Sequence, residues 1–499
     1  MIEGILIGLE TAFSFKNLMM VMIGCFSGTI IGMLPGLGPM TAIALMIPIT
    51  YGFEPSTGLI LMAGVYYGAV FGGSTSSILI NAPGIPGTVA TSFDGYPMAQ
   101  QGKAGKALAI AAYSSFAGGT IAAIFLLIAA PSLSKVSLAF RSPDYFGLMI
   151  LGLTAVSAFS AKGHFLKAMM MVVLGLMLAS VGQDTLSDIP RFTFQNMNLS
   201  DGISFVLVVM ATFAMSEALT IIFKANDPTR IAKQISLSQL GSIKLDKVET
   251  KKMVTTIPRS SVLGFIIGVL PGAGSTIASF LAYGMERNFV NDEEKQKFGK
   301  GSVNGLAAPE TANNAACSGS FVPLLTLGIP GSGTTAVMLG ALLGFGIQPG
   351  PRLYQTNPEI FWSVIMSMYI GMVILLILNL PLIPYIARVL ATPRTFLIPL
   401  ILFFSVTGIY LMSFNNFDIY MMIGIAVVAT VLRLYDFPMP PLILAFVLGG
   451  LMEENLRRSL LISDGSWTFL WDRPLTLIIM LLIVSIVGWQ IYKSFMRNN

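Results

Sequence analysis

The chain is a succession of long apolar runs separated by short polar stretches. Residues 107 to 130, 203 to 223, 360 to 380 and 474 to 492 are examples. A membrane-spanning helix needs about 20 apolar residues, and each of these runs supplies them. The runs lack the alternation over about ten residues that a transmembrane β-strand shows. The pattern predicts an all-α polytopic membrane protein with roughly ten to twelve transmembrane helices.

Two of the apolar runs are interrupted by nearly the same motif. Gly32-Met-Leu-Pro-Gly-Leu-Gly-Pro-Met-Thr41 stands in the first half of the chain, and Gly268-Val-Leu-Pro-Gly-Ala-Gly-Ser-Thr276 in the second. Proline removes a backbone donor and glycine frees the backbone, so a helix is expected to break there. Backbone ends at membrane depth need partners other than lipid. The motifs are therefore expected to line a protein-enclosed site.

A second pair of breaks follows the first. Gly84-Ile-Pro-Gly87 recurs as Gly328-Ile-Pro-Gly331, and a hydroxyl-rich or amide-rich segment precedes each copy. Paired discontinuous segments at matching positions of two halves are typical of the binding site of a secondary transporter. We expect two repeats, with inversion favoured, whose re-entrant or broken helices meet near the midplane.

The polar stretches divide and orient the chain. The expected units are a first transmembrane repeat (1–223), a basic cytoplasmic loop (224–259), a second transmembrane repeat (260–452), and a C-terminal loop, helix and basic tail (453–499). The positive-inside rule places the basic loop and the C-terminus in the cytoplasm and the acidic stretch 183–201 outside.

Composition agrees with a membrane protein and disfavours enzymes. Of 499 residues, 54% are hydrophobic and 11% are charged, which is too little polar surface for a soluble globule. One histidine, His164, and two cysteines leave little to build a metal cluster or a Ser-His dyad. The Gly-x-Gly fragments lack the third glycine of a dinucleotide fingerprint, and no P-loop is present. We expect no cofactor and no nucleic-acid partner.

The breaks predict an anion site. A half-helix that starts after a break presents free N–H groups and a partial positive charge, while its C-terminal end attracts cations. The candidate substrate-binding residues are the small, hydroxyl and amide residues at the breaks and in the polar segments beside them: Pro35, Gly36, Gly38, Thr41, Ser74, Thr75, Ser76, Ser77, Asn81, Pro271, Gly272, Gly274, Ser275, Thr276, Asn313, Asn314, Ser318, Gly331, Ser332, Gly333, Thr334 and Thr335. Helix capping and close packing are the structural alternatives for these residues.

Three acids are candidates for ion coupling. Asp94 follows the second break, Glu310 stands beside the amides, and Glu217 lies inside an apolar run. An acid at membrane depth is a functional hypothesis by default, although a surface cap is the alternative for Asp94 and Glu310. A sodium ion held by backbone carbonyls near the breaks is also compatible with the pattern, with no residues assigned.

The motifs resemble those of a known family, the large membrane subunit of the bacterial tripartite tricarboxylate transporters. The resemblance rests on the two long break motifs, on Gly64-Val-Tyr-Tyr-Gly-Ala-Val-Phe-Gly-Gly-Ser-Thr-Ser-Ser-Ile78, on Asp94-Gly-Tyr-Pro-Met98, on Ala308-Pro-Glu-Thr-Ala-Asn-Asn-Ala315 and on Leu327-Gly-Ile-Pro-Gly-Ser-Gly-Thr-Thr-Ala336. It implies a permease of the bacterial inner membrane that imports a carboxylate, driven by a sodium or proton gradient without an ATPase. It also implies two partners, a small membrane subunit and a periplasmic substrate-binding protein.

The resulting hypothesis is alternating access, with an elevator-like motion of the broken-helix core against a scaffold built partly from helices between 360 and 493. A stand-alone symporter of organic anions, without a binding protein, is the first alternative. An intramembrane enzyme that uses serine or aspartate is the second. The resemblance leaves the substrate open, because the family is similar in serving citrate, other di- and tricarboxylates and aromatic acids.

Overall fold

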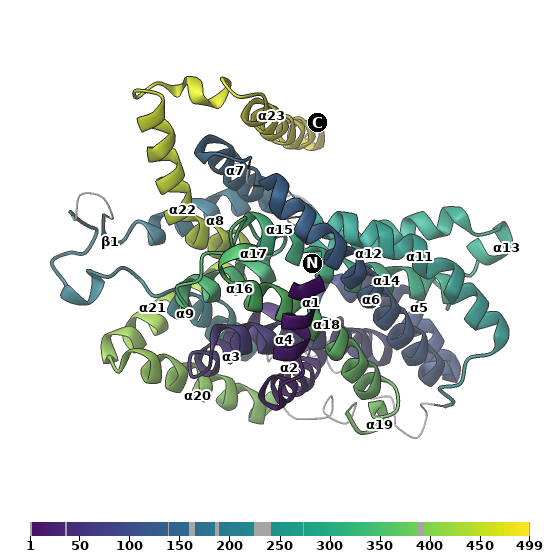
Figure 1. Ribbon diagram of the computed structural model, residues 1–499. Helices are drawn as coiled ribbons and strands as arrows, with labels where there is room; N and C mark the ends of the chain where they lie inside the picture. The colour runs from purple at the N-terminus through teal and green to yellow at the C-terminus, as the bar shows by residue number, and fades with distance from the viewer. Residues whose placement is uncertain are drawn as a thin grey trace.

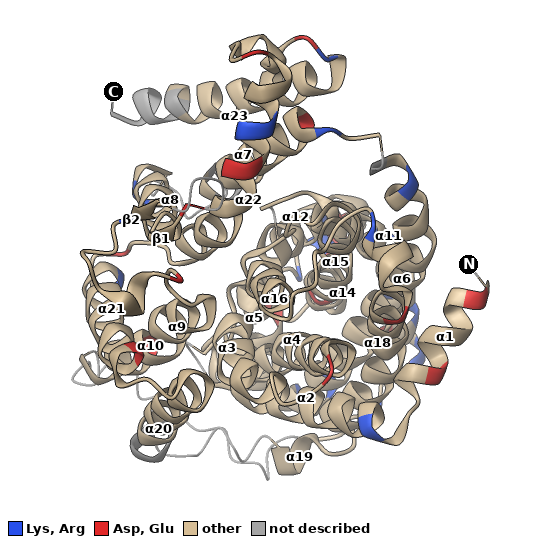
Figure 2. Ribbon diagram, turned by 60° about the vertical axis from the view of Figure 1, so that its left-hand side comes forward, with Lys and Arg blue, Asp and Glu red and all other residues tan. Residues whose placement is uncertain are grey.

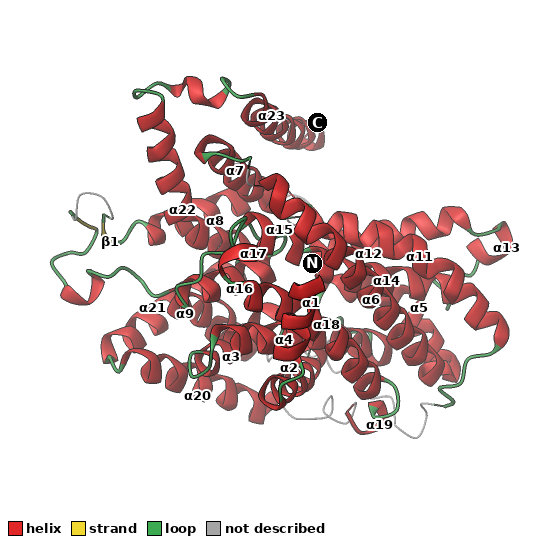
Figure 3. Ribbon diagram, viewed as in Figure 1, coloured by secondary structure: helices red, strands yellow, loops and turns green. Residues whose placement is uncertain are grey.

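The computed structural model describes residues 2–34, 37–137, 139–158, 165–184, 189–223, 241–272, 274–386 and 394–498. Helices make up nearly all of this part (Figure 3), and its strands are β1 (Gly182–Gln183) and β2 (Pro190–Arg191), paired antiparallel. Within it, the helices long and apolar enough to cross a membrane are Phe15–Met33, Pro55–Ile80, Pro86–Val136, Phe205–Phe223, Pro358–Asn379 and Asn416–Leu434. Shorter apolar helices are Pro39–Thr50, Phe165–Ala179, Gly333–Gly344, Ile398–Ser413 and Pro474–Gln490. The prediction of an all-α polytopic membrane protein is confirmed.

The first half begins with two helices that meet at a break. Its elements are α1 (Ile2–Ala12), α2 (Phe15–Met33), α3 (Pro39–Thr50), α4 (Pro55–Ile80), η1 (Pro86–Thr88), α5 (Val89–Met98), η2 (Ala99–Lys103) and α6 (Ala104–Ser137). Proline takes the first position of both α3 and α4, where a missing N–H costs nothing. Helix α4 is buried along almost its whole length, so it forms the centre of this half.

Glycines bring α2 and α4 together backbone to backbone. A Cβ atom added at Gly24 would lie 2.5 Å from the carbonyl oxygen of Leu61, and one at Gly28 would collide with the carbonyl of Val65. Small residues spaced four apart allow this approach in membrane helices. The contact holds α2, the helix that ends at the first break, against the buried helix α4.

The second half has a similar order of elements. These are α11 (Lys247–Val269), α12 (Gly274–Phe289), α13 (Asp292–Lys295), α14 (Val303–Gly319), α15 (Phe321–Leu327), α16 (Gly333–Gly344), α17 (Leu353–Thr356) and α18 (Pro358–Asn379). The short helices α13 and α17 are additional, and two helices, α14 and α15, stand before the second break. Glycine again sets the packing, since a Cβ atom at Gly264 would lie 2.5 Å from the carbonyl oxygen of Ala312. Helix α11 begins inside the stretch 224–259 that we expected as a loop, of which 224–240 lies outside the described residues.

Corresponding breaks have corresponding backbone geometry. Helix α2 ends at Leu34 (φ −80°, ψ 115°), which donates to Ile31, and α11 ends at Leu270 (φ −74°, ψ 121°), which donates to Ile267. The helix before the second break of each half ends in a left-handed residue: the long helix α4 ends at Asn81 (φ 50°), and the seven-residue helix α15 ends at Gly328 (φ 69°). Asparagine and glycine are the residues that adopt this conformation most readily.

The remaining helices surround this centre. They are α7 (Ser142–Ala158), α8 (Phe165–Ala179), η3 (Met197–Leu199), α9 (Phe205–Val209), η4 (Met210–Met215), α10 (Ser216–Phe223), α19 (Ile383–Ile386), α20 (Arg394–Ser413), α21 (Asn416–Leu434), α22 (Pro440–Ile462), η8 (Trp467–Leu470) and α23 (Pro474–Asn498). Figure 1 shows α13 and β1 at opposite ends of the molecule, with α7 and α23 side by side at its upper edge. Charged positions lie mostly at helix ends and on the rim (Figure 2).

Candidate functional site

The four breaks meet at the centre of the molecule. Within each half the two breaks touch: a Cβ atom at Gly84 would collide with the carbonyl oxygen of Gly32, and Gly272 N–H donates to the carbonyl of Gly331 at 3.0 Å. Between the halves, a Cβ atom at Gly333 would lie 3.0 Å from Sδ of Met40. The starts of α3 and α16 are therefore neighbours.

A second contact between the halves contains the candidate anion site. A Cβ atom at Gly87 would lie 2.5 Å from Oδ1 of Asn313 and 3.3 Å from Oγ of Ser275. Gly87 lies in the turn that leads into α5, and Ser275 in the first turn of α12. The first N–H groups of α12 have no partner inside that helix and lie at this place, whereas at the start of α5 the N–H groups of Thr88 and Val89 already donate to the carbonyls of Ile85 and Pro86.

Asn313 is an unpaired amide at this junction. Its side chain is 0% exposed, and neither Oδ1 nor Nδ2 has a hydrogen-bond partner among the described residues. Its neighbour Asn314 donates from Nδ2 to the carbonyl of Glu310 at 3.0 Å and leaves its Oδ1 unpaired. A buried amide without partners costs roughly 1–3 kcal/mol. A cost of that kind is typical of a group reserved for a ligand.

Glu310 is a fully buried carboxylate held by hydroxyls. Oε2 accepts from Ser74 at 2.7 Å and from Ser115 at 2.8 Å, and Oε1 accepts from Thr91. These donors come from α4, α6 and α5, so the carboxylate joins three helices to α14. The ion pairs formed by the described residues do not include Glu310.

Several predicted hydroxyls hold helices together. Ser76 and Ser77 both donate to the carbonyl of Gly73, and Ser77 also reaches Thr88 at 2.8 Å. Ser318 accepts from Tyr67 at 3.0 Å. Ser332 and Thr335 form a capping box at the start of α16.

The other predicted residues lie around the junction in different settings. Thr41 donates to the carbonyl of Phe213 at 3.5 Å, and Asn81 is exposed at the end of α4. Thr75 is buried inside α4. The remaining positions in the described chain lie at helix starts or beside them: Gly38 caps α3, Pro271 and Gly272 precede α12, Gly274 and Thr276 lie in its first turn, Gly331 precedes α16, and Gly333 and Thr334 are the first residues of α16. Pro35, Gly36 and His164 lie outside the described residues.

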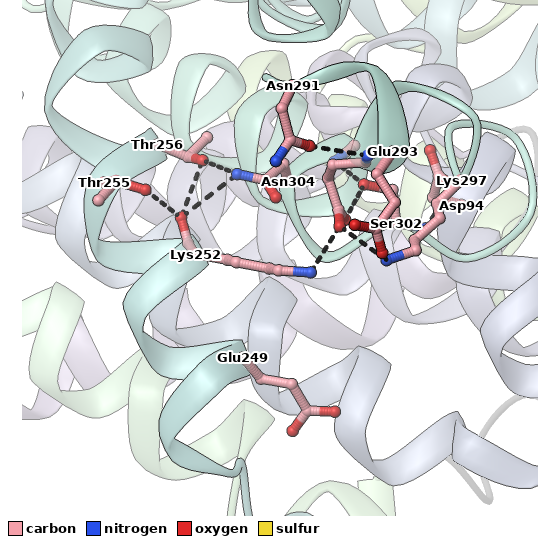
Figure 4. Close-up of polar contacts among 12 residues, drawn as sticks. Asp94, Glu249, Lys252, Thr255, Thr256, Asn291, Glu293, Lys297, Ser302 and Asn304 are labelled. Carbon is pink, nitrogen blue, oxygen red and sulfur yellow. Dashed lines mark hydrogen bonds and ion pairs between the residues drawn. The ribbon is translucent and has the colours of Figure 1, made fainter. Parts of the chain in front are cut away.

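Asp94 binds the loop before α14. Its Oδ1 accepts from the backbone N–H groups of Gly299 at 2.9 Å, Gly301 at 2.9 Å and Ser302 at 2.7 Å, and its Oδ2 accepts from Tyr283 at 3.0 Å. Figure 4 shows Asp94 beside Ser302. Its donors thus fix the start of α14, which carries Glu310 and both amides.

Glu294, Lys252 and Lys297 form a charged cluster, and Figure 4 labels both lysines. The Glu294 carboxylate binds Lys252 at 2.5 Å and Lys297 at 3.2 Å. Burial raises the pKa of Glu294, but the hydrogen bonds and charges of these lysines outweigh it and hold the pKa below its usual value. The third predicted acid, Glu217, lies apart from this cluster and pairs with Arg433 at 2.5 Å.

Several residues of the site were not predicted from the sequence. Thr91 and Ser115 bind Glu310, Gly87 touches Asn313, and Tyr66 approaches Ser332 at 3.4 Å between hydroxyl oxygens. Gly87 and Tyr66 stand inside motifs that were already recognised. Ser115 had a weaker signal, as a hydroxyl inside the apolar run 107–130.

Buried helices broken in pairs in a polytopic helical membrane protein, with the unpaired Asn313 amide at their junction, are typical of secondary transporters. The family model described as the tripartite tricarboxylate transporter TctA family matches residues 18–444, and the chain belongs to this family. The expected family membership is confirmed.

Relatives in Agrobacterium vitis support the match. One, described as an uncharacterized 52.8 kDa protein in the TAR-I ttuC' 3' region, is 43% identical over 465 residues, which cover 93% of this chain and 91% of the relative. A second, described as an uncharacterized protein in the TAR-II ttuC' 3' region, is 43% identical over 212 residues, which cover 42% of this chain and 87% of the relative.

Proposed function

We propose that this chain is the permease that moves a carboxylate across the bacterial inner membrane, by alternating access driven by a sodium or proton gradient. The substrate is a di- or tricarboxylate or a related organic acid. A periplasmic binding protein delivers it, and a small membrane subunit completes the transporter. Membership of the tripartite tricarboxylate transporter family supports the large-subunit role and both partners.

The observation that carries the proposal is the unpaired Asn313 amide at the junction of α5 and α12. Nδ2 of Asn313 and the free N–H groups at the start of α12 are donors suited to a carboxylate. Helix starts supply positive charge without a lysine or arginine in the break motifs. Because Asn313 is fully buried, a substrate reaches it only after one of the two helices moves.

The positions of the bases of the two helix hairpins support inverted repeats. The base of α2–α3 lies with the start of α4, where Lys16 pairs with Glu54 at 3.7 Å. The base of α11–α12 lies with the start of α6, where Lys106 pairs with Asp246 at 3.6 Å. The long helix α4 runs from the first of these regions toward the second, which supports hairpins that enter from opposite sides.

Movement of the broken-helix core supplies alternating access. Helices α20 to α23 and α18 belong to the segment 360–493 that we assign to the scaffold, and the core slides against it in an elevator-like motion. By the positive-inside rule, the basic stretch before α11 and the basic tail with Lys493 and Arg497 support a cytoplasmic location for the start of α11 and for the C-terminus.

Reconstitution tests the proposal. The chain and its small subunit are placed in liposomes, and uptake of radiolabelled citrate and a panel of other carboxylates is measured under a sodium or a proton gradient, with and without the periplasmic binding protein. Uptake that needs both the gradient and the binding protein is expected. Uptake without a binding protein would support a stand-alone symporter instead, and chemical conversion without uptake would support an enzyme.

A further inference from the structure

We infer that the cavity between α4, α6 and α18 is a binding site for the monovalent cation that drives transport, with sodium as its ligand. The inference rests on the proposed function, because it names the site for the coupling ion of that transporter. The cavity has space for about one water-sized sphere. Its polar lining consists of Ser74, Thr75, Ser115 and Asn379, and apolar residues such as Phe71 and Leu108 form the rest.

Asn379 is the observation that points to a ligand. Its side chain is 4% exposed, and Nδ2 donates back to the carbonyl of Leu375 at 3.0 Å. That bond fixes the amide so that Oδ1 is the free atom, and Oδ1 has no hydrogen-bond partner among the described residues. A buried acceptor without a donor, in a cavity that also contains three hydroxyl groups, is suited to a cation.

The hydroxyls of the cavity are already oriented for a cation. Ser74 and Ser115 both give their protons to Oε2 of Glu310, at 2.7 Å and 2.8 Å. Their oxygen lone pairs therefore stay available to a ligand. Oxygen atoms of hydroxyl, amide and carboxylate groups are the ligands that hard cations prefer.

The negative charges around the cavity favour a monovalent cation as its ligand. Glu310 is fully buried, and the ion pairs of the described residues leave it without a lysine or arginine. A buried carboxylate needs a compensating charge or a proton. Helix α18 ends at Asn379, so its C-terminal partial negative charge also falls at the cavity. One carboxylate with neutral oxygens balances a monovalent ion.

The test measures sodium binding without transport. The purified full chain is unfolded by heat in detergent at rising sodium chloride, with choline chloride keeping ionic strength constant. A ligand that binds the folded state raises the midpoint temperature as its concentration exceeds its Kd. We expect sodium to raise the midpoint, and Asn379→Ala to increase the half-saturating sodium concentration by roughly tenfold or more, as loss of a supporting group does at metal sites.

Two further variants keep the test decisive if Asn379→Ala folds poorly. Glu310→Gln keeps the shape of the side chain and removes its charge, so it should abolish the sodium response. Ser114→Ala is the matched control, because Ser114 is buried on the same helix beside Ser115 but does not line the cavity. Its sodium response should equal that of the unmodified chain.

Three results would overturn the site. They are an unmodified chain without a sodium response, an unchanged sodium response in both Asn379→Ala and Glu310→Gln, and a midpoint that follows pH but not sodium, which would make Glu310 a proton carrier. Asn313→Ala separates this site from the proposed function, since it should lose carboxylate binding and keep the sodium response. A sodium response without carboxylate binding by the unmodified chain would leave the cation site standing and contradict the proposed function.

Discussion

Gly87 and Asn313 are in contact across the two halves of the chain. A Cβ atom at position 87 would lie 2.5 Å from Oδ1 of Asn313, so only glycine lets the turn before α5 touch the amide. The contact joins the second break of the first half to the amide pair of the second. It is the closest link between the two halves that the proposed anion site uses.

Replacing Gly87 tests this contact. Gly87→Ala pushes the start of α5 away from Asn313, and a misplacement of about 1 Å at a binding site can cost up to about 100-fold in rate. We expect the initial rate of carboxylate uptake into proteoliposomes to fall by about 10- to 100-fold. Gly284→Ala is the matched control, since a Cβ atom there meets nothing within 4 Å. Full uptake by Gly87→Ala would remove this contact from the site.

Close packing of α2 on α4 predicts a loss of stability. A Cβ atom at Gly24 lies 2.5 Å from the carbonyl oxygen of Leu61, and backbone cannot move aside cheaply. Gly24→Ala should lower the free energy of unfolding by about 1–3 kcal/mol, seen as a lower thermal midpoint in detergent. Gly424→Ala, at an exposed helical glycine with nothing within 4 Å, should leave the midpoint unchanged or raise it.

Asp94 is expected to act on stability rather than on ion binding. Asp94→Ala leaves the N–H groups of Gly299, Gly301 and Ser302 without their acceptor, which should cost about 2–3 kcal/mol. Tyr283→Phe removes only one donor to the carboxylate and should cost about 1 kcal/mol. Thermal unfolding at several sodium concentrations checks both. A changed half-saturating sodium concentration in Asp94→Ala would instead return Asp94 to ion coupling.

Glu294 predicts a pH dependence. Its folded pKa lies below the ordinary value of 4.5, because the lysines that bind its carboxylate outweigh the effect of burial. A lowered folded pKa gives stability that is fully present above pH 4.5 and is lost as pH falls below it. Thermal midpoints between about pH 3 and 6 should therefore fall less steeply in Glu294→Gln than in the unmodified chain.

The neighbouring glutamate is the control for this pH dependence. Glu293 also pairs with Lys297, at 3.5 Å, but its side chain is 85% exposed. Surface ion pairs contribute little, so Glu293→Gln should keep the unmodified pH profile. Equal profiles for Glu294→Gln and the unmodified chain would show that this carboxylate contributes no linkage.

Sequence alone predicted the helical membrane fold and the places where helices break. Apolar runs of helix length and the Pro-Gly motifs follow directly from local chemistry, so the ends of α2 and α11 fell where we expected them. The glycines that let α2 approach α4 were visible as small residues, but their partners were not. A partner such as Leu61 depends on how two distant segments pack.

The site was predictable only in part, for the same reason. Asn313 stood out because an amide in an apolar stretch needs partners, and the structure leaves it unpaired at the junction. Asn379 gave no comparable signal, because a single asparagine at the end of an apolar run reads as a helix end. Its place in the cavity depends on the contact of α18 with α4 and α6.

The most direct test of the central claim is an experimental structure of the transporter with a transported carboxylate bound. We expect density for the carboxylate within hydrogen-bond distance of Nδ2 of Asn313 and of the first N–H groups of α12. Density at another place in the molecule, with the Asn313 amide still enclosed and unpaired, would contradict the account.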